Sequence, residues 1–93
     1  MRKQAHLTIL GIVQGVFYRD FTQENALELG LTGWVRNVSD GTVETCVQGT
    51  EEEIKELIQR CYEGPPSAQV EDIKVEWENL DEKFDTFEVR FSN

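Results

Sequence analysis

The sequence is poor in the residues on which most metal sites and disulfide scaffolds depend. Its 93 residues include one histidine, His6, and two cysteines, Cys46 and Cys61. One histidine cannot build a histidine-based metal site, and two cysteines without metal-ligand spacing are too few for a disulfide framework. The cysteines fall in opposite phases of their predicted elements, so we expect two reduced structural thiols. This cysteine usage favours a cytoplasmic protein.

Long apolar runs, linkers and repeats are also absent. The first ten residues lack the apolar core of a signal peptide, and no run of 18 or more apolar residues follows. No glycine-rich dinucleotide fingerprint or nucleotide P-loop occurs. We therefore expect no membrane association, and a single domain over residues 1–93, since this length suits one hydrophobic core.

Basic residues are scarce, with nine Lys and Arg against 18 Asp and Glu and a net charge of −9. Residues 1–38 carry four basic and three acidic side chains, whereas residues 39–93 carry five and fifteen. Because nucleic-acid affinity depends on basic side chains that neutralise phosphates, the composition argues against a nucleic-acid partner. The first half of the chain is left free to present a local positive site.

Hydrophobic periodicity predicts five strands and two helices. The helix that begins near Tyr18 ends before Gly30, where a left-handed C-cap is expected, and the second begins at Thr50 with Glu53 completing a capping box. Asp40-Gly41 is a strong hairpin signal. The expected order is strand 5–10, helix 18–29, strand 32–38, strand 42–48, helix 51–63, strand 70–77, loop 79–85 and strand 87–91.

This order is β, α, β, β, α, β with an extra C-terminal strand. Two helices cannot cover both faces of such a sheet, so we expect both on one face of an antiparallel sheet. The predicted fold class is the α+β, ferredoxin-like split βαβ sandwich. That fold hosts many unrelated functions, so function has to be argued from a site.

The segment from Gly11 to Arg19 is a candidate anion site. A strand ends there, a loop containing Gly15 follows, and a helix begins with an arginine near its first turn. The unpaired N–H groups at a helix start suit an anion, whereas a cation placed there for helix stability alone is unfavourable. From the spacing alone, Arg19 could equally be a surface arginine that follows a loop and binds no anion.

A second candidate is Asn37, which ends the segment Gly33-Trp34-Val35-Arg36-Asn37. An asparagine on a strand has donor and acceptor groups that can hold a water in one orientation. The alternative is an asparagine that ends its strand by bonding its own turn, and the residues alone do not separate the two.

Together, Gly11 to Arg19 and Gly33 to Glu44 resemble the motifs of the acylphosphatase family. The resemblance continues through Gln48-Gly49, the turn Gly64-Pro65-Pro66 and the aromatic C-terminal strand, and so covers essentially the whole chain. It implies a small monomeric hydrolase of acyl phosphates, without metal or other cofactor, and a ferredoxin-like fold.

The resemblance also implies a role for each motif residue. Arg19 is expected to be the catalytic, phosphate-binding arginine, and Asn37 to orient the attacking water. The phosphate cradle is expected to be formed by backbone amides up to Arg19, namely those of Gln14, Gly15, Val16, Phe17 and Tyr18. Ile12 stands where many members carry a basic residue, and Phe17 where many bacterial members carry glycine. We expect these departures to alter substrate contact or rate rather than abolish activity.

Two alternatives remain. The same cradle could serve a non-catalytic phosphate-binding module, although such a module would not need Asn37. The chain could also be a carbamoyl-phosphate-handling domain like the one at the front of hydrogenase-maturation carbamoyltransferases. Its length, with no zinc-ligand cysteines following, favours a stand-alone protein.

Overall fold

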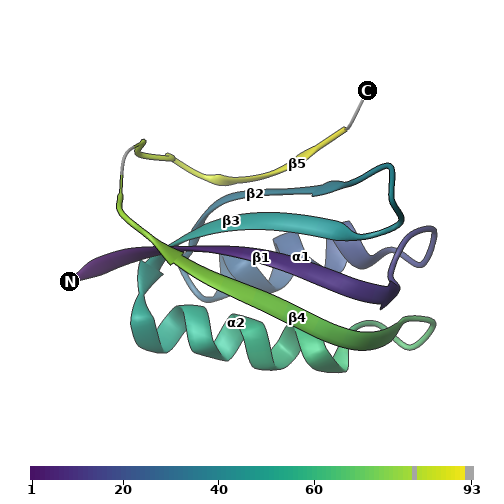
Figure 1. Ribbon diagram of the computed structural model, residues 1–93. Coiled ribbons are helices and arrows are strands. Elements are labelled where there is room, and N and C mark those ends of the chain that lie inside the picture. Colours follow the sequence, from purple (N-terminus) through teal and green to yellow (C-terminus); the bar gives the residue numbers. More distant parts are fainter. Residues whose placement is uncertain (81, 92–93) are drawn as a thin grey trace.

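The computed structural model describes residues 1–80 and 82–91. Within them, five strands form one sheet and two helices cover one of its faces (Figure 1). The elements in chain order are β1 (Arg2–Ile12), α1 (Tyr18–Glu28), β2 (Thr32–Asn37), β3 (Val43–Thr50), α2 (Glu51–Glu63), β4 (Gln69–Glu78) and β5 (Phe87–Arg90). The spatial strand order is β4-β1-β3-β2-β5. The predicted ferredoxin-like α+β fold with an added C-terminal strand is confirmed.

The prediction of an antiparallel sheet is wrong, because the sheet is mixed. β5 pairs parallel with β2, whereas the other neighbouring strands are antiparallel. The connectivity explains this direction. β1 and β2 both run opposite to β3, and β4 runs opposite to β1. A strand that follows β4 after one loop turns back, so it runs parallel to β2 when it reaches the β2 edge.

The strand boundaries differ from the predicted ones where polar residues pair through their backbones. β1 begins at Arg2 rather than at residue 5, because residues 2–4 pair with residues 48–50 of β3. The hairpin between β2 and β3 leaves residues 38–42 as its loop. The predicted loop 79–85 does lie between β4 and β5, with Asp81 outside the described residues.

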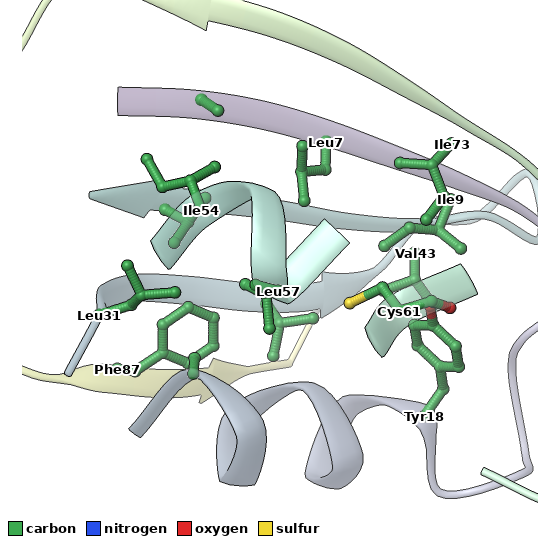
Figure 2. Packing of buried hydrophobic residues seen from close by; sticks show 14 of the residues in the cluster. Leu7, Ile9, Tyr18, Leu31, Val43, Ile54, Leu57, Cys61, Ile73 and Phe87 are labelled. Carbon is green, nitrogen blue, oxygen red and sulfur yellow. The ribbon is translucent and has the colours of Figure 1, made fainter. Parts of the chain in front are cut away.

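The core lies between the sheet and the helices. Leu7 and Ile9 project from β1 toward Leu57 and Cys61 of α2, and Tyr18 enters from the start of α1 (Figure 2). All five side chains are fully buried. Complete burial of a leucine or isoleucine contributes about 1.5–3 kcal/mol, so these contacts hold the helices on the sheet.

The start of α2 and the end of α1 are set by the local sequence signals that predicted them. The Thr50 hydroxyl accepts the Glu53 N–H at 3.2 Å and the Glu53 carboxylate accepts the Thr50 N–H at 3.1 Å, which completes the capping box. α1 ends with Gly30 at φ 76°, followed by a 2.9 Å hydrogen bond from the Leu31 N–H to the Ala26 carbonyl. This pattern is a Schellman cap, which requires the positive φ that glycine adopts without cost.

Both cysteines are free and buried, and they lie on opposite sides of the sheet. Cys61 packs in the core under the helices. Cys46 lies on the helix-free face, where its neighbours across the sheet are His6 and Trp34. Burial raises the pKa of each thiol to about 11, so both remain protonated near neutral pH. No helix in residues 1–80 or 82–91 is long and apolar enough to cross a membrane.

Candidate active site

The loop between β1 and α1 and the hairpin between β2 and β3 lie at the same end of the sheet (Figure 1). The β1–α1 loop covers residues 13–17, and the hairpin loop covers residues 38–42. Hydrogen bonds from Gln14 to the hairpin join the two loops directly. The fold therefore brings the two sequence motifs, which are about twenty residues apart in the chain, to one place.

The backbone N–H groups of the β1–α1 loop are available to a ligand. From Gly15 to Arg19 these groups donate to no acceptor in the described part of the chain, and α1 has no side-chain N-cap bond. Gly15 and Phe17 have φ values of 73° and 61°, so the loop turns twice through the left-handed region. Such turns gather successive N–H groups into a concave surface, here at the positive end of the α1 dipole. The arrangement can hold an anion.

Arg19 stands in the first turn of α1 beside these amides. With Gly15, Phe17 and Asp20 it lines a pocket of about 300 Å³. The guanidinium carbon lies 5.1 Å from the centre of the Phe91 ring, and this stacking favours one orientation of the guanidinium. Arg19 forms no ion pair with any described residue, so its fork of N–H donors can bind an external anion.

Asn37 is the last residue of β2, and its side-chain oxygen Oδ1 is buried without a hydrogen-bond donor among the described residues. A buried acceptor without a partner is costly, unless water or a ligand supplies the missing donor. The sequence also allowed Asn37 to hydrogen-bond its own turn, but Asp40 makes the side-chain hydrogen bonds within that turn. Its carboxylate accepts the N–H of Thr42 at 3.0 Å and the hydroxyl of Thr42 at 2.7 Å. The Asn37 oxygen is left for another donor.

The side chain of Gln14, to which the sequence assigns no role, bonds to the hairpin. Its Nε2 donates to the carbonyl of Val38 at 2.7 Å and to that of Thr42 at 2.8 Å. Both amide hydrogens are therefore used on the hairpin. Only the backbone N–H of Gln14 remains a candidate for the predicted substrate contact.

Tyr18 and Val16 also turn their side chains away from the pocket. The Tyr18 ring is buried in the core, and its hydroxyl donates to the carbonyl of Cys61 at 2.6 Å (Figure 2). Burial raises the pKa of Tyr18, which keeps the hydroxyl protonated as a donor. Val16 is partly buried against the core cluster. These side chains hold the loop against the core, and only the N–H groups of the two residues remain candidates for the predicted substrate contacts.

Two features outside this loop are less suited to an anion. His6 faces the helix-free side of the sheet, with its Nε2 3.0 Å from the Glu44 carboxylate. A larger hollow of about 450 Å³ lies between the hairpin loop and β4, and its charged lining is acidic, consisting of Asp40, Glu71 and Asp72. The smaller pocket is the better anion site, because Arg19 lines it beside Asp20 and the loop N–H groups are unpaired among the described residues.

Sequence reasoning missed two contributors to this region, the Gln14 side chain and Phe91. A glutamine in a loop otherwise built of small and apolar residues was an available signal for the first. No local signal exists for Phe91. Its stacking on Arg19 depends on the parallel placement of β5 beside β2, which brings Phe91 to this end of the sheet.

Comparison with known proteins agrees with this fold. A family model described as acylphosphatase matches residues 5–89. An acylphosphatase of Pelotomaculum thermopropionicum is 43% identical over 90 residues, which cover 97% of this chain and 98% of that protein. The crystal structure of an acylphosphatase from Bacillus subtilis has a TM-score of 0.92 at 33% identity, covering 97% of this chain and 99% of that one.

An acylphosphatase structure from Coxiella burnetii superposes with a TM-score of 0.90 at 40% identity, covering 96% of this chain and 93% of that one. The family match spans both loops of the candidate site and nearly all of the sheet. This chain belongs to the acylphosphatase family.

Proposed function

We propose that this chain hydrolyses small acyl phosphates at the β1–α1 loop, where Arg19 and the backbone amides of residues 14–19 bind the phosphate and Asn37 orients the attacking water. Hydrolysis of acyl phosphates is the function of the acylphosphatase family. One observation carries the assignment of residues: two sets of polar groups without hydrogen-bond partners in the described part of the chain lie at the same end of the sheet. They are the N–H donors of the loop with Arg19, and the buried acceptor Oδ1 of Asn37.

Hydrolysis of an acyl phosphate requires mainly that the reactants are positioned and that negative charge on the phosphoryl group is stabilised. The water oxygen forms a bond to phosphorus while the bond between phosphorus and the acyl oxygen breaks, and the carboxylate leaves with the bonding electrons. A carboxylate is a good leaving group, so no strong general acid is needed. Phosphoryl transfer is catalysed largely by positioning and electrostatic stabilisation. The Arg19 fork and the loop amides supply positive charge around the phosphoryl oxygens.

Asn37 acts on the nucleophile. Its Oδ1 accepts a hydrogen bond from the water and leaves a lone pair of the water directed at phosphorus. An amide oxygen is too weak a base to take the proton, so the proton passes to an oxygen of the substrate's own phosphate. A pH–rate profile that requires an enzyme group titrating near neutrality would contradict this route.

A non-catalytic phosphate-binding module remains the second candidate, and Asn37 separates the two. A binder uses the arginine and the amides but has no use for an unpaired acceptor beside them. We further propose that residues 1–93 act as one domain, as a cytoplasmic monomer without a nucleic-acid partner. The net charge of −9 supports the last point.

The test is hydrolysis of benzoyl phosphate and acetyl phosphate, with excess chelator present and with a phosphate monoester as the control substrate. We expect turnover of the acyl phosphates alone, unchanged by chelator. Arg19→Gln should lower kcat/KM by about 10³-fold or more while the protein remains folded. A folded Arg19→Gln variant with substantial activity would remove Arg19 from the mechanism. Phosphate binding without any turnover would establish the binding module instead.

A further inference from the structure

The Gln14 side chain makes the only side-chain hydrogen bonds, in the described part of the chain, between the β1–α1 loop and the hairpin that follows Asn37. Its Nε2 donates to Val38 at 2.7 Å and to Thr42 at 2.8 Å. The same two carbonyls close the hairpin, because the Val38 carbonyl accepts the Gly41 N–H at 3.0 Å and the Thr42 carbonyl accepts the Val38 N–H at 2.9 Å. Gln14 therefore occupies the remaining acceptor capacity of both carbonyls.

The residues at the two ends of this link adjoin the two halves of the proposed site. Gln14 directly precedes Gly15, and the N–H groups of residues 15–19 donate to no acceptor in the described part of the chain. Val38 directly follows Asn37, whose Oδ1 is the unpaired acceptor. A shift of Gln14 therefore moves the phosphate-binding amides and the water-orienting oxygen relative to each other.

We infer that Gln14 is a positioning residue: its side-chain amide sets the distance between the phosphate held by the loop and the water held by Asn37. The inference rests on the proposed function of these groups. Gln14 touches neither the phosphate nor the water with its side chain. It acts by fixing the separation of groups that do, and reacting atoms misplaced by about 1 Å can cost 10²-fold in rate.

The two hydrogen bonds to the hairpin require a glutamine at position 14. Two carbonyl oxygens require two N–H donors at the end of a side chain of this length, and a neutral side-chain amide supplies both. A glutamate would direct negative oxygens at the carbonyls and repel them. A methionine has similar length and bulk but donates nothing. Because Gly41 and Val38 still satisfy the two carbonyls, the Gln14→Met variant is expected to fold.

The first measurement is amide hydrogen exchange at Val38 and Gly41 in the wild type and in Gln14→Met. We expect both N–H groups to exchange several-fold faster in the variant, since the hairpin is no longer tied to the loop. The matched control is Gln23→Met. The Gln23 amide likewise donates to a backbone carbonyl, that of Phe87 at 3.0 Å, but it ties α1 to β5 away from the hairpin. Unchanged exchange at Val38 and Gly41 in Gln14→Met would overturn the inference, whatever the activity.

The second measurement is a double-mutant cycle on kcat with benzoyl phosphate. Gln14→Met should lower kcat about 10- to 100-fold, with a change of less than about threefold in the inhibition constant of phosphate. In the Asn37→Ala background the same substitution should have almost no further effect, because the group that it positions is gone. Gln23→Met should leave kcat unchanged in both backgrounds.

Two kinetic results would overturn the positioning role. One is an equal loss of kcat from Gln14→Met with and without Asn37, and the other is an equal loss of kcat and of phosphate affinity. If Asn37→Ala itself has full activity, the water-orienting part of the proposed function fails, and hydrogen exchange still decides whether Gln14 holds the hairpin. Should Gln14→Met not fold, Gln14→Asn, whose amide is one methylene too short to reach both carbonyls, is tested with the same expectations.

Discussion

The hydroxyl of Tyr18 donates a 2.6 Å hydrogen bond to the backbone carbonyl of Cys61, which ties the first turn of α1 to the last turn of α2 (Figure 2). The carbonyl belongs to the set that a helix leaves unpaired at its C-terminal end. Arg19 is the next residue after Tyr18, so this bond in the core also anchors the backbone from which the Arg19 side chain extends. Burial raises the pKa of Tyr18 and so keeps the donor protonated.

Tyr18→Phe should therefore destabilise the fold without opening a cavity. The phenyl ring still fills the core, but the buried Cys61 carbonyl loses its donor. We expect the free energy of unfolding in urea to fall by about 1–3 kcal/mol. Tyr62→Phe is the control, because the Tyr62 ring is exposed and its hydroxyl bonds are 3.3 and 3.4 Å long. Equal stability of the two variants would show that the buried bond contributes nothing.

Gly33 is expected to tolerate no side chain. Its φ is 141°, and a Cβ there would lie 1.9 Å from the backbone oxygen of Cys46. Relief requires β2 to move away from β3, so Gly33→Ala should cost at least about 3 kcal/mol or prevent folding. Gly41→Ala is the matched variant, since its φ of 95° is also unfavourable but nothing lies within 4 Å. That variant should lose only about 1 kcal/mol. Thermal unfolding of both variants measures the difference, and similar losses would contradict the argument.

Phe17 is the one non-glycine residue with positive φ among the described residues, at 61°, and its side chain is 79% exposed. A side chain in this conformation costs about 1–2 kcal/mol, and glycine avoids that cost. Alanine keeps the strain and loses the ring. We therefore expect Phe17→Gly to be more stable than Phe17→Ala by about 1 kcal/mol in equilibrium denaturation. The reverse order would mean that the loop relaxes to another conformation.

The dependence of stability on pH in the acid range should include a contribution from Asp40 in the hairpin loop. Hydrogen bonds from the side chain and backbone of Thr42 hold the pKa of Asp40 below its ordinary value of 3.8. The folded state thus favours the charged form of Asp40. The contribution of this carboxylate to the free energy of unfolding is therefore present above pH 3.8, and it is lost as the pH falls through the lower pKa of the folded state. The stability difference between wild type and Asp40→Asn should be constant near neutral pH and shrink in acid. A difference that grows in acid would reverse the sign and contradict this account.

Several elements could be predicted because their signals are local. The capping box of Thr50 and Glu53, the cap at Gly30 and the Asp40-Gly41 turn each depend on residues within one turn of chain. The burial of Leu7 and Ile9 follows from strict alternation in β1. The two site motifs are also local, so Arg19 and Asn37 could be selected before their surroundings were known.

What could not be predicted depends on contacts between distant segments. The parallel pairing of β5 with β2 depends on which edge of the sheet the last strand reaches, and no local pattern encodes that choice. The stacking of Phe91 on Arg19 follows from it. The bonds from Gln14 to the hairpin likewise require both loops to be in place. Alternation placed Cys46 on an outward face, and its burial there depends on side chains from neighbouring strands.

The central claim is that water oriented by Asn37 attacks phosphorus while Arg19 and the loop amides hold the phosphate. Hydrolysis of acetyl phosphate by the wild-type protein in ¹⁸O-labelled water tests it most directly, with the label located by mass spectrometry of both products. Attack at phosphorus places the label in the phosphate and leaves the acetate unlabelled. Label in the acetate would show attack at the acyl carbon and contradict the account.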